Sequence, residues 1–229
     1  MGTYDNPQVH HPLSVTRRPR VKREEVEKRV MKCVEDFFVE ADYPVTLPSL
    51  VMDNLALQSG VSRSALYRVY PSTLELQEAI AARLVHHKLY PLDRFDTITM
   101  DAVAKYANVL NASSRHSLTV GTFGVLLSGD INPDAVGRLR HGIQSSIENP
   151  EVRSKLLDAL NQQHVKYLDA VAQALQYIAR CCSHVVLPGR EHEYTSAFTA
   201  LAHGFASSGI SDDQSTAYSA IAGAFTQRA

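Results

Sequence analysis

The stretch Leu55–Tyr70, LALQSGVSRSALYRVY, decides the fold. It predicts a helix, a turn at Gly60 and a second short helix, because glycine adopts the left-handed conformation of such a turn without steric cost. The apolar positions of the second helix recur at i, i+3 and i+4 and share one side: Leu66, Val69 and Tyr70. The opposite side carries two arginines and two hydroxyl groups: Arg63, Ser64, Tyr67 and Arg68.

This division of faces is what a DNA-recognition helix needs. The apolar side anchors the helix, while arginine can bond bidentately to guanine edges or to phosphate and hydroxyl groups reach phosphate oxygens. Ser62 is the predicted N-cap of the helix, since its side-chain oxygen can accept a backbone N–H of the first turn.

The run GVSRSALYRVYPSTLEL from Gly60, preceded by Leu55 and Ala56 and by an amphipathic helix from about Val26, resembles the DNA-binding domain of the TetR family of bacterial transcriptional regulators. The resemblance covers roughly residues 22–90. The chain departs from the family pattern twice. Thr73 stands where the family usually has a phosphate-contacting lysine, and the segment 42–49 is a few residues longer than usual.

The resemblance implies an all-α fold with a helix-turn-helix DNA-binding domain over 22–90, including a linking helix, and an effector-binding and dimerisation domain over 91–229. It implies a ligand-responsive transcriptional regulator, expected to be a repressor that binds a palindromic double-stranded DNA operator as a homodimer and is released by a small molecule. The predicted DNA-binding residues are Arg17, Arg18, Arg20, Ser49, Ser62, Arg63, Ser64, Ala65, Tyr67, Arg68 and Thr73.

Composition agrees with a soluble helical protein and limits the partners. The net charge of −1 argues against a general polyanion binder, so DNA contact has to come from local clustering of cations. One such cluster is RRPRVKR at 17–23, which overlaps the end of a predicted disordered basic arm over residues 1–21. Three cysteines, with no apolar run long enough for a membrane and no signal-like N-terminus, favour a cytoplasmic protein, and the resemblance implies a bacterial one.

Apolar periodicity and capping signals predict the other helices. Ser72 with Glu75 forms a capping box, as does Ser211 with Gln214, while Asn132-Pro133 and Asn149-Pro150 each mark a helix start. The predicted ranges are 22–41, 49–58, 72–90, 97–112, 114–129, 133–147, 150–182, 191–207 and 212–227. The resemblance implies a dimer interface built from the last part of 150–182 with 191–207 as a four-helix bundle.

Polar and aromatic residues within the apolar C-terminal helices suggest a ligand pocket, because such pockets are mostly apolar with a few placed polar groups. The candidates are Tyr106, His116, Phe123, His141, Gln144, His164 and Tyr167.

No motif indicates catalysis, a cofactor or a metal, so the chain is not expected to be an enzyme. The pair His10 and His11 and the group Cys181, Cys182, His184 and His192 lack the spacing of a structural zinc site. A second hypothesis is a helical small-molecule-binding or adaptor protein that has lost DNA binding, motivated by Thr73 and the modest charge of residues 1–90. A third, an all-helical enzyme, has no residue set to support it.

Overall fold

The computed structural model describes residues 21–37, 46–86, 89, 90, 92–95, 97–130, 132–208 and 213–229. Arg17, Arg18, Arg20, the two N-terminal histidines and the Ser211 cap lie outside these residues. The described part of the chain is almost entirely helical, which confirms the all-α prediction. Within it, no helix is both long enough and apolar enough to cross a bilayer.

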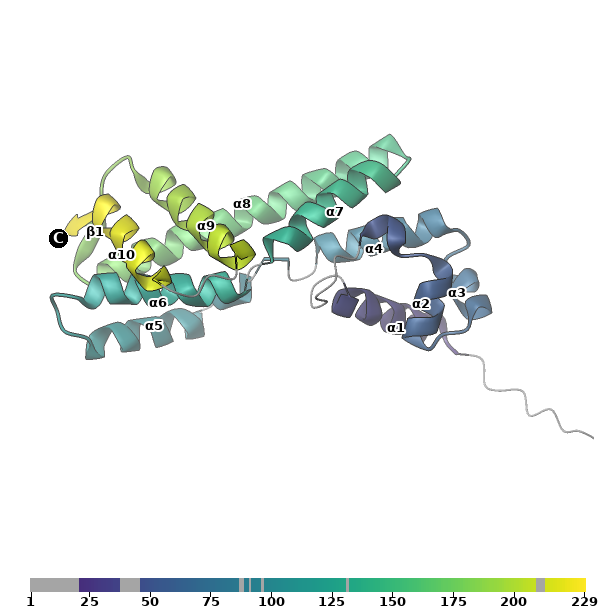
Figure 1. Cartoon of the computed structure of the whole chain (residues 1–229), viewed down its shortest axis with the longest axis horizontal. Coiled ribbons are helices and arrows are strands. Elements are labelled where there is room, and N and C mark those ends of the chain that lie inside the picture. Colours follow the sequence, from purple (N-terminus) through teal and green to yellow (C-terminus); the bar gives the residue numbers. More distant parts are fainter. Residues whose placement is uncertain are drawn as a thin grey trace, which may run out of the picture.

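The N-terminal helices form one group at one end of the molecule (Figure 1). We call this group the head. It consists of α1 (Arg23–Glu35), the 3-10 helix η2 (Leu47–Ser49), α2 (Met52–Ser59), α3 (Arg63–Val69) and α4 (Thr73–Val85).

Two boundaries in the head differ from the sequence prediction. Pro48 belongs to η2 and does not start the second long helix, because the backbone is extended at Val51 and α2 begins only at Met52. The helix α4 ends at Val85 and does not continue to Tyr90. Leu89 and Tyr90 are buried, and Tyr90 stacks on Tyr167 at 5.1 Å between ring centroids, so the chain bends inward to bury both side chains.

The remaining helices follow the predicted ranges to within a few residues. A second 3-10 helix, η3 (Leu92–Phe95), precedes them. They are α5 (Thr97–Val109), α6 (Arg115–Asp130), α7 (Pro133–Ser146), α8 (Pro150–Cys181), α9 (Glu191–Ser208) and α10 (Gln214–Phe225). Figure 1 shows α5, α6, α9 and α10 at the end opposite the head, while the α7–α8 hairpin extends over α4.

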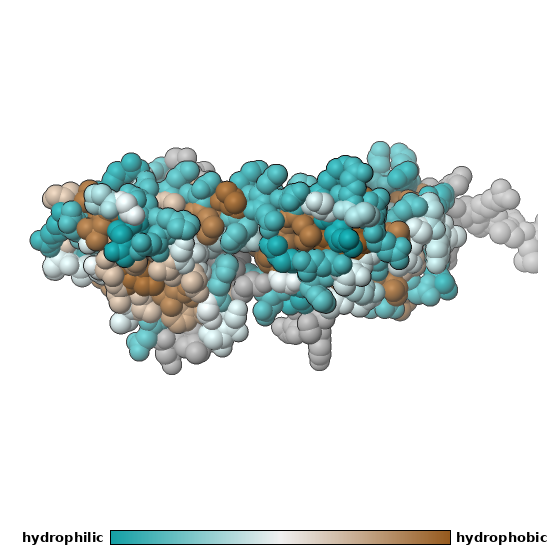
Figure 2. Space-filling view, turned by 90° about the horizontal axis from the view of Figure 1, so that it is seen from above, coloured by the Kyte–Doolittle hydropathy of each residue, from teal (hydrophilic) through white to brown (hydrophobic). Residues whose placement is uncertain are grey.

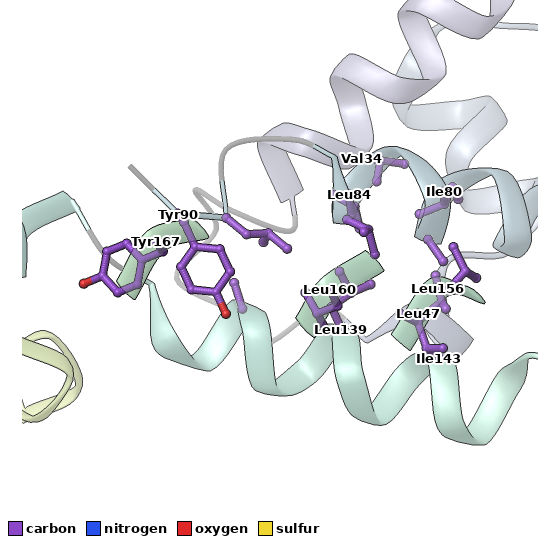
Figure 3. Packing of buried hydrophobic residues seen from close by; sticks show 14 of the residues in the cluster. Val34, Leu47, Ile80, Leu84, Tyr90, Leu139, Ile143, Leu156, Leu160 and Tyr167 are labelled. Carbon is purple, nitrogen blue, oxygen red and sulfur yellow. The ribbon is translucent and has the colours of Figure 1, made fainter. Parts of the chain in front are cut away.

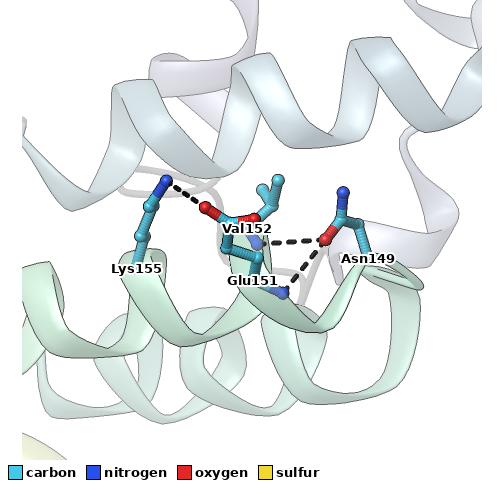
Figure 4. A network of polar contacts seen from close by, with 4 residues as sticks. All are labelled: Asn149, Glu151, Val152 and Lys155. Atoms are coloured by element: carbon cyan, nitrogen blue, oxygen red, sulfur yellow. Dashed lines mark hydrogen bonds and ion pairs between the residues drawn. The ribbon is translucent and has the colours of Figure 1, made fainter.

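Both asparagine–proline signals mark helix starts as predicted. Asn132 accepts the backbone N–H of Ala135 at 2.9 Å and caps α7. Asn149 accepts the N–H groups of Glu151 and Val152 and caps α8, next to an ion pair between Glu151 and Lys155 (Figure 4). These caps satisfy N–H groups that have no partner within a helix.

A two-stranded antiparallel sheet closes the C-terminal end. The strand β1 (His184–Val186) pairs with β2 (Thr226–Arg228), with Val185 opposite Gln227. These strands have no predicted counterpart, and the last helix ends before residue 227, to which its pattern extended. Three-residue strands are too short for an alternation signal, and their pairing joins segments that are far apart in the chain.

The head packs directly on the α7–α8 hairpin (Figure 3). Leu47 of η2 is fully buried and faces Gly142 of α7, where an added Cβ would lie 2.6 Å from the Leu47 Cβ. The amide of Gln77 donates to the Leu47 carbonyl at 3.5 Å. Helices α4, α7 and α8 complete this apolar contact with Ile80, Leu84, Leu139, Ile143, Leu156 and Leu160. The longer segment between the first two helices therefore supplies a contact between the head and the rest of the molecule.

At the other end, α10 lies unusually close to α6. Gly121 and Gly124 face Ser215 and Tyr218, and a Cβ at either glycine would overlap these residues. The Tyr218 hydroxyl hydrogen-bonds to Ser128, and the Ser219 hydroxyl donates to the Ser117 carbonyl at 2.9 Å. The glycines thus let the last helix enter the core, where the Tyr218 side chain is fully buried.

Candidate DNA-binding surface and effector cavity

The turn between α2 and α3 has the predicted geometry. Gly60 has a φ of 65° and ends α2 in the left-handed conformation. The Val61 N–H then donates to the Ala56 carbonyl at 3.1 Å, and Ser62 caps α3 by accepting the Ala65 N–H at 3.3 Å. These bonds set the direction in which α3 leaves α2.

The helix α3 has one buried and one exposed face, as its spacing predicts. Leu66 is fully buried, and Val69 and Tyr70 are nearly so. The exposed positions are Ser62, Arg63, Ser64, Tyr67 and Arg68. Burial, together with the nearby Glu27 carboxylate, raises the pKa of Tyr70 to about 12, so its hydroxyl stays neutral in the core of the head.

Ala65 does not belong to the exposed face. Its side chain is buried, because it follows Ser64 by one helical position and turns toward α2 with Leu66. Its predicted role in DNA contact stays a prediction.

Both arginines of the exposed face have partners within the head. Arg63 Nη2 lies 2.6 Å from Asp53 Oδ1 of α2. Arg68 Nη2 donates to the Val21 carbonyl at 3.0 Å, just before α1. The second contact places Val21, the fifth residue of the RRPRVKR segment, beside α3.

Two other predicted DNA-binding residues lie elsewhere in the head. Ser49 is not at the start of α2. Its hydroxyl donates to the Thr46 carbonyl at 2.7 Å and accepts the Thr46 N–H at 3.2 Å, so it closes the η2 turn. Thr73 is exposed at the first position of α4, and Ser72 caps that helix by accepting the Glu75 N–H at 3.1 Å.

A cavity of about 510 Å³ lies between η3, α5 and α8. One side of α8 forms a wall of small alanines and longer polar side chains, and the lining residues of this helix are Ala170, Gln173, Ala174, Tyr177 and Arg180. The opposite walls are Leu92 and Phe95 of η3 with Met100 and Asp101 of α5. The volume and mixed lining suit a small organic molecule.

None of the seven predicted ligand residues lines this cavity. Tyr106, His141 and Gln144 are exposed. Phe123 and Tyr167 are buried behind the cavity wall, where both rings pack edge-on against Phe95 at 5.9 and 6.2 Å. These residues do not share this cavity, because the helices turn most of them in different directions. Their role in ligand binding stays a prediction.

Tyr167 and His164 belong instead to an aromatic cluster beside the head. Tyr90 contacts both rings, at 5.1 and 5.6 Å, and His203 of α9 stacks on Tyr167 at 6.2 Å. Burial lowers the pKa values of His164 and His203, with Arg140 adding to the effect on His164. Within the described residues, Tyr167 Oη and His203 Nε2 are buried without a hydrogen-bond partner.

His116 is buried in a different place. Its ring stacks on His184 of β1 at 4.2 Å, and its Nδ1 lies 3.5 Å from the Thr226 hydroxyl of β2. Burial, and secondarily His184, lowers the pKa of His116 to about 4. His184 Nδ1 lies 2.9 Å from the Cys182 carbonyl. In the part of the chain that the structure describes, no three His, Cys, Asp or Glu side chains converge as metal ligands would.

The cavity residues that the sequence analysis missed carried a weak signal. Ala170, Ala174 and Tyr177 share one side of α8, and two small residues one turn apart on a helix can leave space. That signal cannot be separated from close helix packing without knowing what faces it. Leu92 and Phe95 reach the cavity through the fold of η3, which no sequence pattern predicted.

Comparison with solved structures agrees with this architecture. A protein from Mesorhizobium loti that is assigned to the TetR family of transcriptional regulators superposes with a TM-score of 0.51 at 14% identity, covering 90% of this chain and 96% of that one. A second such protein, from Rhodococcus, has a TM-score of 0.39 at 15% identity and covers 88% and 96% of the two chains. No protein-family model matches the chain, and no curated protein matches its sequence. The chain thus has the fold of a TetR-family regulator, with a helix-turn-helix head and a helical C-terminal part.

Proposed function

We propose that this protein is a ligand-responsive, DNA-binding transcriptional regulator. The observation that carries the proposal is the face of α3, where Arg63, Ser64, Tyr67 and Arg68 are exposed while Leu66 on the opposite side is fully buried. A helix held in this way fits into the major groove of DNA and presents its arginine and hydroxyl groups to the bases and phosphates there.

In the proposed complex, two copies of the head bind successive major grooves of a palindromic operator, because a twofold-symmetric dimer matches a twofold-symmetric site. Arg63 and Ser64 face the bases, while Tyr67, Arg68 and Ser62 face the phosphates. The arm with Arg17, Arg18 and Arg20 adds a sequence-independent electrostatic term. Bound at a promoter, such a dimer acts as a repressor.

The dimer face that we propose differs from the sequence prediction. The end of α8 is inside the protomer, with Val171, Leu175 and Ile178 buried, and its exposed positions include Gln173 and Gln176. Apolar surface instead gathers at the end of the molecule formed by α5, α6, α9 and α10 (Figure 2). The exposed apolar residues that α6 and α10 contribute at this end of the molecule are Leu118, Val125, Leu126, Ala220 and Ala224. Contiguous exposed apolar surface marks interaction sites.

Replacing Val125 with Asp tests this face. The substitution places a charge within the proposed interface and should convert the dimer to a monomer in light scattering. Val109→Asp is the matched control, since Val109 is exposed on α5 outside the α6–α10 face. Equal masses for both variants and the wild type would exclude the α6–α10 face.

The proposed effector site is the cavity between η3, α5 and α8. Its walls connect to the head, because η3 is the next described element after α4 and α8 packs on α4. An effector that binds more tightly to the conformation with one distance between the two heads shifts the population of dimers toward that conformation. Release from the operator follows when that spacing does not fit successive grooves.

The experiment for the function is selection of bound fragments from random-sequence duplex DNA by the full-length protein. We expect enrichment of a palindromic sequence. Replacing Arg68 with Ala should weaken binding about equally for all sequences and reduce the salt slope by about 1, as expected for a phosphate contact. Unchanged affinity would remove Arg68 from the DNA-binding surface.

A second candidate is a small-molecule binder that has lost DNA binding. Two observations favour it: Asp53 offsets the charge of Arg63, and exposed Thr73 supplies no cation at the start of α4. Selection that enriches no sequence, with no salt-sensitive retention of duplex DNA, would support this candidate over the regulator.

A further inference from the structure

The two arginines of the α3 face are held in different electrostatic settings. Arg63 Nη2 lies 2.6 Å from a carboxylate oxygen of Asp53, in the first turn of α2. Arg68 Nη2 donates to a neutral backbone carbonyl, that of Val21, at 3.0 Å. The charge of Arg63 is therefore offset locally, while Arg68 keeps its full positive charge.

The Asp53–Arg63 pair is not needed to hold the two helices together. Its side chains are 57% and 63% exposed, and ion pairs at such exposure contribute little to stability. Buried Leu55, Ala56 and Leu66 already join α2 to α3. The consequence of the pair lies at the surface that would meet DNA.

A carboxylate at that surface acts against phosphate. It repels the DNA backbone, and it also satisfies the positive end of the α2 dipole that would otherwise attract an anion. The edges of bases carry no net charge, so the same carboxylate opposes their approach much less. Asp53 thus disfavours backbone contact at the point where Arg63 is exposed.

The pair also orients the guanidinium. Arginine has five N–H donors in a rigid fork, so an arginine held at Nη2 still has donors for the O6 and N7 acceptors of guanine. A side chain already held in place loses less conformational entropy on binding than a free one.

We propose that Asp53 is a positioning residue for sequence discrimination. It directs Arg63 toward a guanine edge and lowers the affinity for non-specific DNA, while Arg68 supplies a phosphate contact. This inference rests on the proposed DNA-binding function.

The test compares full-length wild type with Asp53→Asn, which keeps the shape of the side chain and removes its charge. Affinities are measured over a range of salt concentrations for the duplex that wild type selects from a random pool and for a scrambled duplex. We expect Asp53→Asn to bind the scrambled duplex more tightly, with a salt slope steeper by about 0.9 if one phosphate contact is gained. The ratio of the two affinities should fall.

Glu193→Gln is the matched control. Glu193 forms an ion pair of 2.5 Å with Arg190, and their side chains are 56% and 48% exposed. The control therefore removes the same charge from a similar pair at the start of α9, away from the head. It should leave the affinity ratio unchanged. Arg63→Gln should reduce discrimination at one base pair by about five- to 150-fold, the range for a lost bidentate contact.

The outcomes separate the inference from the function. If Asp53→Asn shifts the affinities for both duplexes by the same factor, Asp53 acts only through net charge and the inference is wrong. An unchanged ratio with unchanged affinities overturns it as well. If wild type enriches no sequence, the proposed function fails and the inference fails with it. If wild type enriches a sequence but Asp53→Asn leaves the ratio of the two affinities unaltered, only the inference fails.

Discussion

The contact between Gly142 and Leu47 joins the head to α7, and replacing Gly142 with Ala perturbs it by one methyl group. The new Cβ would lie 2.6 Å from the Leu47 Cβ, closer than two carbon atoms approach without displacement. Leu47 is fully buried among side chains of α4, α7 and α8, so it has little room to move. The contact atom is a Cβ close to the backbone, so a change of rotamer cannot relieve the overlap.

The magnitude follows from two opposing terms. Overpacking a well-packed site destabilises by about 1–3 kcal/mol. Alanine in place of glycine within a helix stabilises by about 0.5–1 kcal/mol. Gly137→Ala on the same helix contains only the second term, because a Cβ at Gly137 meets nothing within 4 Å. The difference between the two variants therefore isolates the contact and should be about 1–3 kcal/mol.

The assay is equilibrium unfolding in urea at a fixed protein concentration, so that dimerisation affects all variants equally. Gly137→Ala should be more stable than wild type, and Gly142→Ala clearly less stable than Gly137→Ala. Leu47→Gly provides the coupling test, since it removes the contacting atom. In that background Gly142→Ala should lose its penalty, which a double-mutant cycle measures. Equal stability of the two alanine variants would refute the close approach of η2 and α7.

Three further predictions concern other parts of the chain. The pKa of His116 is lowered to about 4 from an ordinary value of 6.5, so the unfolded chain binds the proton first as pH falls. The free energy of unfolding should therefore decrease between pH 6.5 and pH 4, by up to about 1.4 kcal/mol per pH unit. His116→Phe should flatten this dependence in unfolding measured over pH, and an identical slope in the variant would contradict the prediction. Ser62→Ala removes the cap of α3 and should lower the free energy of unfolding in urea by about 1 kcal/mol. Ser64→Ala removes no cap and should keep a stability near that of wild type. Equal losses of stability in the two variants would show that Ser62 does not act as a cap. Deleting residues 1–20 should flatten the salt dependence of DNA binding by about 0.9 for each lost phosphate contact, and an unaltered slope would leave the arm without a role in binding.

Local signals in the sequence were sufficient for most of the α-helices and for the faces of α3. The positions of Leu66, Val69 and Tyr70 at helical spacing separated the buried side from the exposed side, and Gly60 and Ser62 marked the turn and the cap. Asn132 and Asn149 located two more helix starts. These features depend on residues within a few positions of one another, so the order of residues along the chain determines them.

The remaining features depend on which segments meet. The ion pair of Arg63 with Asp53, the docking of Leu47 on Gly142 and the cavity wall at Phe95 each join residues from different elements, and no periodicity within one helix encodes such a meeting. For the same reason, residues chosen by type, such as His141 and Gln144, proved to be exposed. By itself the sequence determined the helices and the arginine-bearing face, because local hydrogen bonding and helical spacing are properties of short segments. Only the tertiary structure decided the partners of that face, the position of the cavity and the attachment of the head, because these depend on the burial of apolar side chains between distant segments.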